Sequence, residues 1–415
     1  MLFLLVILTE MAFTQDFQRY FEDKTLRLDY IFSGNAEHQS IALDELSTLP
    51  KWYGKHRHLA EVPMEGNGQI VVRQHRQQEV IYRYSFSTLF QEWLTYDEAK
   101  TTPRSFENVF LIPLPKDTVD VTVELYDNRR NIMTTLTHTI NPKDILIRHI
   151  GEDNVTPYVT LRKADDPSRC VNIAYVAEGY TAEEMDDFLA DAEKATAALL
   201  RHEPFKSEEK NLNIVAVKAI SADSGTSEPG NGIWRQTALG SHFDTFYSER
   251  YLTTLHLKRL HDCLAGTPYE HIIVLVNTSH YGGGGILNSY NLSMTKHNQF
   301  EPVVVHEFGH SFAGLADEYA YDFEPLEMYP LDVEPWEANI TTLKNFVGKW
   351  ENLVDKHAKI PTKGKTGVGL YEGAGYRLKG VYRPTYNCRM RANNTPEFCI
   401  VCQNAIRKVI HFYTE

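Results

Sequence analysis

The stretch Val303-Val-Val-His306-Glu307-Phe-Gly-His310-Ser-Phe312 decides the fold of the second half of this 415-residue chain. It contains the pattern H-E-x-x-H. Residues four apart on a helix lie on one face, one turn apart, so His306 and His310 can both reach one ion. Glu307 lies close enough to touch a metal-bound water without ligating the metal. The apolar residues at 303–305, 308 and 312 predict a buried helix, which would hold both histidines against a rigid support.

A third metal ligand is expected from the residues that follow, Gly314-Leu-Ala-Asp317-Glu318-Tyr319. Gly314 can adopt the left-handed conformation that ends a helix and reverses the chain, which would bring Asp317 beneath His310. Three protein ligands with an open fourth position are what a catalytic Zn²⁺ needs, so one zinc ion is predicted here. Glu318 is predicted to accept a hydrogen bond from a ligating imidazole.

The chemistry expected of such a site follows from the ion. Zinc lowers the pKa of its water to about 7 and polarises a scissile carbonyl. Glu307 is then the expected general base, taking the proton of the water and passing it to the leaving amine, which is worth roughly 10²–10⁴-fold in rate. This is amide hydrolysis without a covalent intermediate. The alternative is a pair of histidines on a solvated helix with no catalytic role.

Four glycines precede the predicted helix, in the segment Tyr281-Gly282-Gly283-Gly284-Gly285. Without a P-loop lysine and a helix cap after them, they do not make a nucleotide-binding loop. Backbone without side chains at a sheet edge would let an extended peptide pair by strand addition, so these glycines are predicted to bind substrate. An ordinary flexible loop is the alternative interpretation.

Two domains are expected from the length of the chain and from a change in its pattern. Residues 16–145 contain short alternating stretches, such as Glu79-Val-Ile-Tyr-Arg-Tyr-Ser-Phe86, and predict a β-sandwich. Trp52 and Trp93 could form a carbohydrate platform there, although such aromatics more often fill a core. Residues 146–415 alternate strands and helices and predict a zincin-like α/β domain, with the linker beginning at 141–143. The strands expected in it are 171–176, 212–217 and 272–276, and the helices expected run from a capping box at Thr181 to about Leu200 and from about Leu252 to Cys263. The predicted fold class is therefore a multidomain α+β protein.

The composition and the first residues favour an exported protein. The formal net charge of −13 disfavours nucleic acid and anionic membranes as partners. Residues 1–15 resemble the apolar core of a signal peptide with cleavage near Gln15, although they lack a basic start, and a buried N-terminal strand is the alternative. Eight apolar residues are too few to span a bilayer, and no later stretch qualifies, so no membrane insertion is expected. The predicted location is secreted, periplasmic or on the cell surface.

Five cysteines leave two interpretations open: Cys170, Cys263, Cys388, Cys399 and Cys402. The last two are spaced as C-x-x-C. One interpretation is a disulfide, which an exported protein can form, and an odd count then leaves one thiol unpaired. A structural zinc site normally takes four ligands, and only three cysteines are close in sequence.

The run from His306 to Tyr319 resembles the IgA-peptidase family of zincin (metzincin-like) metallopeptidases. The segments 281–285, Asn387-Cys-Arg-Met390-Arg and Phe398-Cys-Ile-Val-Cys402 are also similar to it. The β-rich N-terminal part resembles the family's own N-terminal domain, so the likeness covers nearly the whole chain. It implies a secreted zinc endopeptidase that acts on a protein or peptide, which in the founding members is immunoglobulin A.

The metzincin pattern H-E-x-x-H-x-x-G-x-x-H/D gives a broader analogy with one departure. One extra residue separates His310 from Gly314, so that Ala316 stands where the strict pattern places a ligand and Asp317 follows it. Met390 would be the methionine of the turn beneath the imidazoles, without ligating the metal. Ordinary core packing is the alternative role for this methionine.

Two rival functions are weighed against a peptidase. One is a glycan- or protein-binding surface module with a vestigial zinc site, which the intact Glu307 argues against. The other is a metallo-amidase acting on glycopeptide or mucin. The sequence indicates neither a preferred side chain in the substrate nor an oligomeric state.

Overall fold

Two four-stranded sheets form the N-terminal part of the computed structural model, which describes residues 17–321 and 328–415. The strand orders are β5-β1-β2-β8 and β4-β3-β6-β7. Their bounds are β1 (Phe21–Gly34), β2 (Gln39–Leu49), β3 (Gly68–Gln74), β4 (Val80–Phe86), β5 (Arg104–Pro115), β6 (Val119–Tyr126), β7 (Ile132–Ile140) and β8 (Arg148–His149). The predicted signal peptide at 1–15 lies outside the described residues.

The two sheets pack face to face, which confirms the predicted β-sandwich. Strand β6 alternates buried and half-buried residues along its whole length, as expected when one face of an antiparallel strand lies in the core. Across the core, the rings of Phe86 in β4 and Phe110 in β5 are 4.3 Å apart between centroids. Trp52 and Trp93 are 3% and 0% exposed, so both fill this core instead of forming a carbohydrate platform.

A six-stranded mixed sheet follows, in the order β13-β14-β12-β10-β11-β9. Its strands are β9 (Tyr158–Arg162), β10 (Val171–Glu178), β11 (Leu212–Val217), β12 (His271–Val276), β13 (Gly283–Ile286) and β14 (Tyr290–Met294). The four central strands run parallel, and the edge strands β9 and β13 are antiparallel to their neighbours. The predicted α/β part is thus confirmed, with β13 at the edge nearest the H-E-x-x-H helix.

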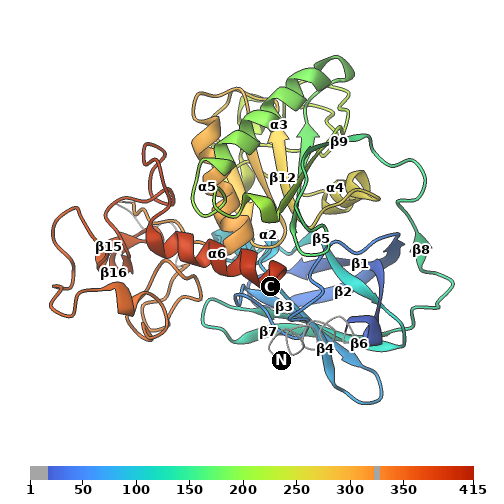
Figure 1. Ribbon diagram of the computed structural model, residues 1–415, viewed down its shortest axis with the longest axis horizontal. Helices are drawn as coiled ribbons and strands as arrows, with labels where there is room; N and C mark the ends of the chain where they lie inside the picture. The colour runs from blue at the N-terminus through green and yellow to red at the C-terminus, as the bar shows by residue number, and fades with distance from the viewer. Residues whose placement is uncertain (1–16, 322–327) are drawn as a thin grey trace, which may run out of the picture.

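Both faces of this sheet are covered, which explains why its central strands read as continuous apolar runs. Ala174 and Val176 of β10 face α4 (Leu257–Leu264) and the sandwich, with which they share one core. Ile173 and Tyr175 face the opposite side, where α3 (Met185–Leu200), α5 (Phe300–Ala313) and α6 (Ile400–Thr414) lie. Figure 1 shows the sandwich in blue below the sheet, helix α3 above it and helix α5 to its left.

The sequence pattern predicted the start of helix α3 correctly but placed the start of helix α4 too early. The backbone N–H of Thr181 donates to Glu184, and this capping box begins the turn that leads into α3, as expected. A helix was expected from about Leu252, but α4 begins at Leu257. The preceding residues are extended because Tyr251 pairs with Gly283 and Thr253 pairs with His242.

The remaining elements are short. They comprise α2 (Leu89–Trp93), β15 (Tyr371–Ala374), β16 (Arg377–Arg383) and the 3₁₀ turns η1 (Asp97–Lys100), η2 (Ala182–Glu184), η3 (Glu209–Asn211), η4 (Pro229–Asn231), η5 (Thr245–Tyr247) and η6 (Glu351–Leu353). Helix α6 ends the chain and packs against α5 and β10. No helix in the described ranges is long and apolar enough to cross a membrane.

Candidate metal centre and active-site cleft

Helix α5 presents His306 and His310 on one face, with their Nε2 atoms 3.0 Å apart. The rest of the helix is held by buried apolar side chains, which include Val305, Phe308 and Phe312. Gly314 ends the helix in the left-handed conformation, with φ of 58°, as predicted. The two imidazoles are 13% and 17% exposed, so they face a partly open space from a rigid support.

Backbone carbonyls fix the orientation of both rings. Nδ1 of His306 bonds the carbonyl of Arg389 at 3.0 Å, and Nδ1 of His310 bonds the carbonyl of Leu315 at 2.5 Å. A carbonyl oxygen can only accept, so each Nδ1 carries a proton, and each Nε2, once free of a proton, turns its lone pair into the space that the two rings share. This is the arrangement that metal-ligating histidines have.

Asp317 completes the group. Its Oδ1 lies 3.0 Å from Nε2 of His306 and 3.4 Å from Nε2 of His310. The side chain is 5% exposed, and Oδ1 makes no hydrogen bond of ordinary geometry with any described residue. Oδ2 accepts a hydrogen bond of 2.5 Å from the hydroxyl of Tyr376, which fixes the carboxylate from its far side.

Two imidazole nitrogens and one buried carboxylate oxygen that converge in this way fit a divalent cation. Tetrahedral zinc with bonds of 2.0–2.1 Å would separate two ligating nitrogens by about 3.3 Å, close to the separation of the two Nε2 atoms.

The pKa shifts of Asp317 and His310 also favour a cation at this position. Burial works against the charge of Asp317, yet the two histidines hold its pKa well below the usual range. Burial likewise opposes the charge of His310, but the Asp317 carboxylate raises its pKa to about 9. The pocket therefore favours one positive charge beside this carboxylate.

Glu307 is half-buried beside the histidines, and its partial removal from water raises the pKa of its carboxyl group. The glycines of β13 leave room for it. A Cβ atom on Gly283 would lie 2.8 Å from Oε1 of Glu307, and one on Gly285 would lie 2.5 Å from the backbone oxygen of Glu307. Because Gly283 and Gly285 have no side chain, α5 can pack close to the edge strand β13. The sequence did not indicate this role for the glycines.

The predicted substrate-binding residues, Gly282 to Gly285, all line the cleft. At Gly283 the outer edge of β13 is already paired within the chain. Leu252 donates to the carbonyl of Gly283 and Gly283 donates to that of Arg250, each at 3.3 Å. Only every second residue of a strand points its backbone N–H and C=O toward a given edge. The next N–H and C=O groups that point outward from this edge of β13 are therefore those of Gly285.

Met390 is fully buried beneath α5. Its sulfur would lie 2.8 Å from a Cβ atom on Gly309, the residue next to His310. The neighbouring Arg389 supplies the carbonyl that orients His306, and the carbonyl of Met390 accepts from the backbone N–H of Glu318. The turn at 387–391 thus lies under the histidines, where the methionine of a metzincin-like turn was expected.

The expected contact of Glu318 with an imidazole is wrong. Both Nδ1 atoms bond backbone carbonyls, and Glu318 instead accepts from Asn339 at 3.0 Å and contacts the thiol of Cys402 at 3.2 Å. Consecutive side chains in an extended segment point to opposite sides, so Asp317 faces the histidines and Glu318 faces the interior. Burial raises the pKa of Glu318 to about 8.

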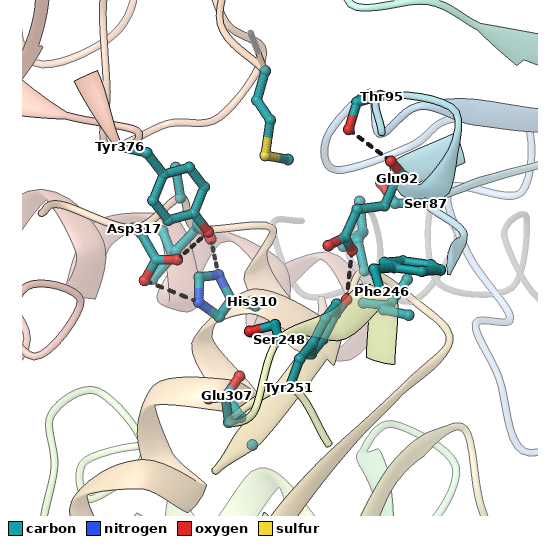
Figure 2. Close-up of a pocket in the computed structure, with 18 of the residues that line it drawn as sticks. Ser87, Glu92, Thr95, Phe246, Ser248, Tyr251, Glu307, His310, Asp317 and Tyr376 are labelled. Atoms are coloured by element: carbon teal, nitrogen blue, oxygen red, sulfur yellow. Dashed lines mark hydrogen bonds and ion pairs between the residues drawn. The ribbon is translucent and has the colours of Figure 1, made fainter. Parts of the chain in front are cut away.

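The site opens into a cleft of about 1310 Å³ whose walls come from both parts of the chain. Figure 2 shows His310, Asp317 and Tyr376 on one side of it and Glu92 and Tyr251 on the other. Glu92 belongs to α2 of the sandwich and accepts a hydrogen bond of 2.5 Å from Tyr251, and burial raises its pKa to about 7.

Sequence reasoning missed Tyr376, Glu92 and Tyr251. Each is distant in sequence from the metal motif, and no local pattern distinguishes either tyrosine among the 23 of the chain. Only the tertiary fold brings them to the cleft.

Comparison with known sequences agrees with this geometry. A family model described as IgA Peptidase M64 matches residues 159–366 and 363–410, and one described as Peptidase M64 N-terminus matches residues 16–137. No curated protein matches the chain. The two family models together cover most of the sequence, including the helix with the two histidines. The chain therefore belongs to the IgA peptidase M64 family and is a metallopeptidase that acts on protein or peptide substrates.

Proposed function

We propose that this protein is a secreted zinc-dependent endopeptidase, with His306, His310 and Asp317 as the metal ligands and Glu307 as the general base. The observation that carries the proposal is the convergence of two oriented Nε2 atoms on a buried carboxylate oxygen that lacks a hydrogen bond among the described residues. This donor set suits zinc and leaves one position open for water or substrate.

When bound, zinc supplies Lewis acidity: it lowers the pKa of a ligated water to about 7 and polarises a carbonyl oxygen. The residues of the chain do the rest. Glu307, next to His306 on α5 and facing Gly283, accepts the proton of the attacking water and returns it to the leaving amine. The Tyr376 hydroxyl holds Asp317, and the carbonyls of Arg389 and Leu315 keep both imidazoles in the ligating tautomer.

The size of the cleft supports an endopeptidase. Its volume of about 1310 Å³ exceeds the roughly 300–1,000 Å³ that is usual for small-molecule sites. A chain that extends on both sides of the scissile bond therefore fits better than a small amide. The backbone of Gly285 offers a place for that chain to pair by strand addition. Aromatic side chains line much of the cleft and would contact it: Tyr96, Phe246, Tyr247, Tyr251, Tyr281, Tyr319, Tyr321, Tyr329, Trp336 and Tyr376.

Immunoglobulin A and other host glycoproteins are the substrates to test first, since the matched family is described as an IgA peptidase. The apolar residues 2–8 support export. The decisive experiment combines metal analysis with cleavage of a peptide library, with and without a chelator. We expect zinc at the histidine site, internal cleavage, and loss of cleavage on chelation that added zinc reverses. Zinc-loaded protein that binds immunoglobulin A or glycan but cuts no peptide would favour the binding-module alternative.

A further inference from the structure

A second group of metal-binding side chains lies behind the first. Glu318, Cys388, Cys399 and Cys402 are all buried, and one ligand atom from each lies within 4.8 Å of those of the other three. We call this group the Cys3Glu cluster. Three separate segments supply it: the turn after α5, the turn that contains Met390, and the first residues of α6.

The spacing of the cluster differs from that of a disulfide. The sulfurs of Cys388 and Cys402 are 3.7 Å apart, whereas a disulfide joins sulfurs at about 2.05 Å. Four ligands at the vertices of a tetrahedron around zinc, with Zn–S bonds of about 2.3 Å, place sulfurs about 3.8 Å apart. None of the five cysteines, all of which lie in the described ranges, forms a disulfide in this structure.

Glu318 provides a second, independent observation. It is 0% exposed, and its Oε2 makes no hydrogen bond with any described residue. Its Oε1 accepts from Asn339 and lies 3.2 Å from the sulfur of Cys402. A buried carboxyl group with an unpartnered oxygen is costly unless it takes up a proton or binds a cation, and this side chain points at three thiols that would ligate the same cation.

The backbone around the cluster suits thiolate ligands. The N–H of Cys399 points at the sulfur of Cys388 at 3.2 Å, and Cys399 and Cys402 have the C-x-x-C spacing at the start of α6. Two buried guanidinium groups interact electrostatically with the cluster, Arg383 with Glu318 and Arg389 with Cys388. Three thiolates and one carboxylate around Zn²⁺ carry a net charge of −2, which these two arginines would balance.

We propose that the Cys3Glu cluster is a second metal centre, a closed structural zinc site with three sulfur ligands and one carboxylate oxygen. Thiolates select zinc over magnesium or calcium, and four protein ligands leave no position for water. The site ties together the two turns that shape the catalytic centre. Glu318 follows Asp317 directly, and Cys388 precedes Arg389, whose carbonyl orients His306. The proposal does not depend on what the histidine site binds.

The test measures zinc in the full-length protein, purified with reductant and added zinc. We expect two zinc ions per chain, and X-ray absorption at the zinc edge should show Zn–S bonds near 2.3 Å. The double variant His306→Ala/His310→Ala should retain one zinc with sulfur ligands. Cys402→Ser should lose the sulfur-bound zinc, and Glu318→Gln should bind it more weakly. Cys170→Ser is the matched control, a buried cysteine outside the cluster, and should keep both ions.

Thiol counting keeps the proposal testable even if Cys402→Ser does not fold. Wild-type protein denatured in the presence of a chelator should titrate five thiols. Three thiols and a mass lower by the two hydrogens lost in forming a disulfide would overturn the proposal. So would a single zinc ion bound only by nitrogen and oxygen. A single zinc ion bound by sulfur would instead support this site and refute the proposed zinc at the histidines.

Discussion

Gly283→Ala tests whether the glycines of β13 serve the catalytic base or the substrate. The added Cβ atom would lie 2.8 Å from Oε1 of Glu307, 3.0 Å from its Cγ and 3.1 Å from its Cδ. Ordinary contacts begin near 3.4 Å, so the carboxyl group must withdraw by about 0.6 Å. Gly283 has no positive φ, so alanine adds a steric contact without backbone strain.

A displacement of this size matters because proton transfer depends on position. A shift of about 1 Å in a catalytic group can cost roughly 10²-fold in rate, so we expect kcat of Gly283→Ala to fall by about 10- to 100-fold. KM should change little. If Gly283 instead serves only to let the substrate strand approach, KM should rise while kcat stays near its wild-type value.

Gly284→Ala is the matched control, because neighbouring residues of a strand face opposite sides. Its Cβ atom would meet Tyr251 at 2.7 Å and the backbone oxygen of Leu252 at 2.9 Å, a comparable clash away from Glu307. Peptide hydrolysis, bound zinc and the melting temperature are measured for both variants. We expect both to lose some stability, typically about 1–3 kcal/mol for an overpacked site, and only Gly283→Ala to lose most of its kcat. Equal kcat in wild type and Gly283→Ala, with zinc retained, would refute the reasoning.

Four further outcomes are expected. Glu307→Gln should keep zinc and the fold but lose at least about 10²-fold in peptide hydrolysis, because the water loses its proton acceptor; wild-type turnover with full zinc would exclude this role. Asp317→Ala should lose most of the zinc at the histidine site after dialysis, and zinc retained there would show that Asp317 is not a ligand. Tyr376→Phe should weaken zinc affinity or rate by roughly 10–100-fold through the lost hydrogen bond to Asp317, measured by competition with a chelator. Residues 16–145 should unfold cooperatively when made alone, but at a lower temperature than in the full chain, because isolation exposes the core face shared with α4; a melting curve without a transition would show that the sandwich is not independent.

The sequence could predict the features that rest on local periodicity. Helix α5, its glycine stop and the apolar strands β10, β11 and β12 follow from patterns within a few residues, and the structure contains them all. Asp317 was placed beside the histidines by the same means, since a left-handed Gly314 turns the chain back beneath the helix. The extra residue relative to the metzincin pattern does not prevent this. Asp317 itself points toward the histidines, so Ala316 does not have to supply a ligand.

What the sequence could not predict depends on contacts between distant segments. The start of α4 was misplaced because Tyr251 pairs with Gly283 of β13 and Thr253 pairs with His242, contacts that keep these residues out of the helix and that no local pattern indicates. The partner of Glu318 was missed for a related reason. Its nearest cysteine in the C-terminal direction, Cys388, lies 70 positions away, so nothing near Glu318 indicates a cluster of thiols.

The same long-range contacts explain why the C-terminal segment belongs to the catalytic site. The chain from 387 to 402 supplies no ligand to the histidine centre, yet it provides the carbonyl that orients His306, the methionine beneath Gly309 and three of the four side chains of the Cys3Glu cluster. Most of this segment, residues 387–399, lies outside the helices and strands, and the backbone N–H of Glu318 donates to the carbonyl of Met390 within it. A bound cation at Glu318 and the three cysteines would fix it to the residue next to Asp317. Loss of that ion should therefore weaken zinc binding at the histidines as well, whereas loss of the histidine-bound zinc should leave the cluster occupied.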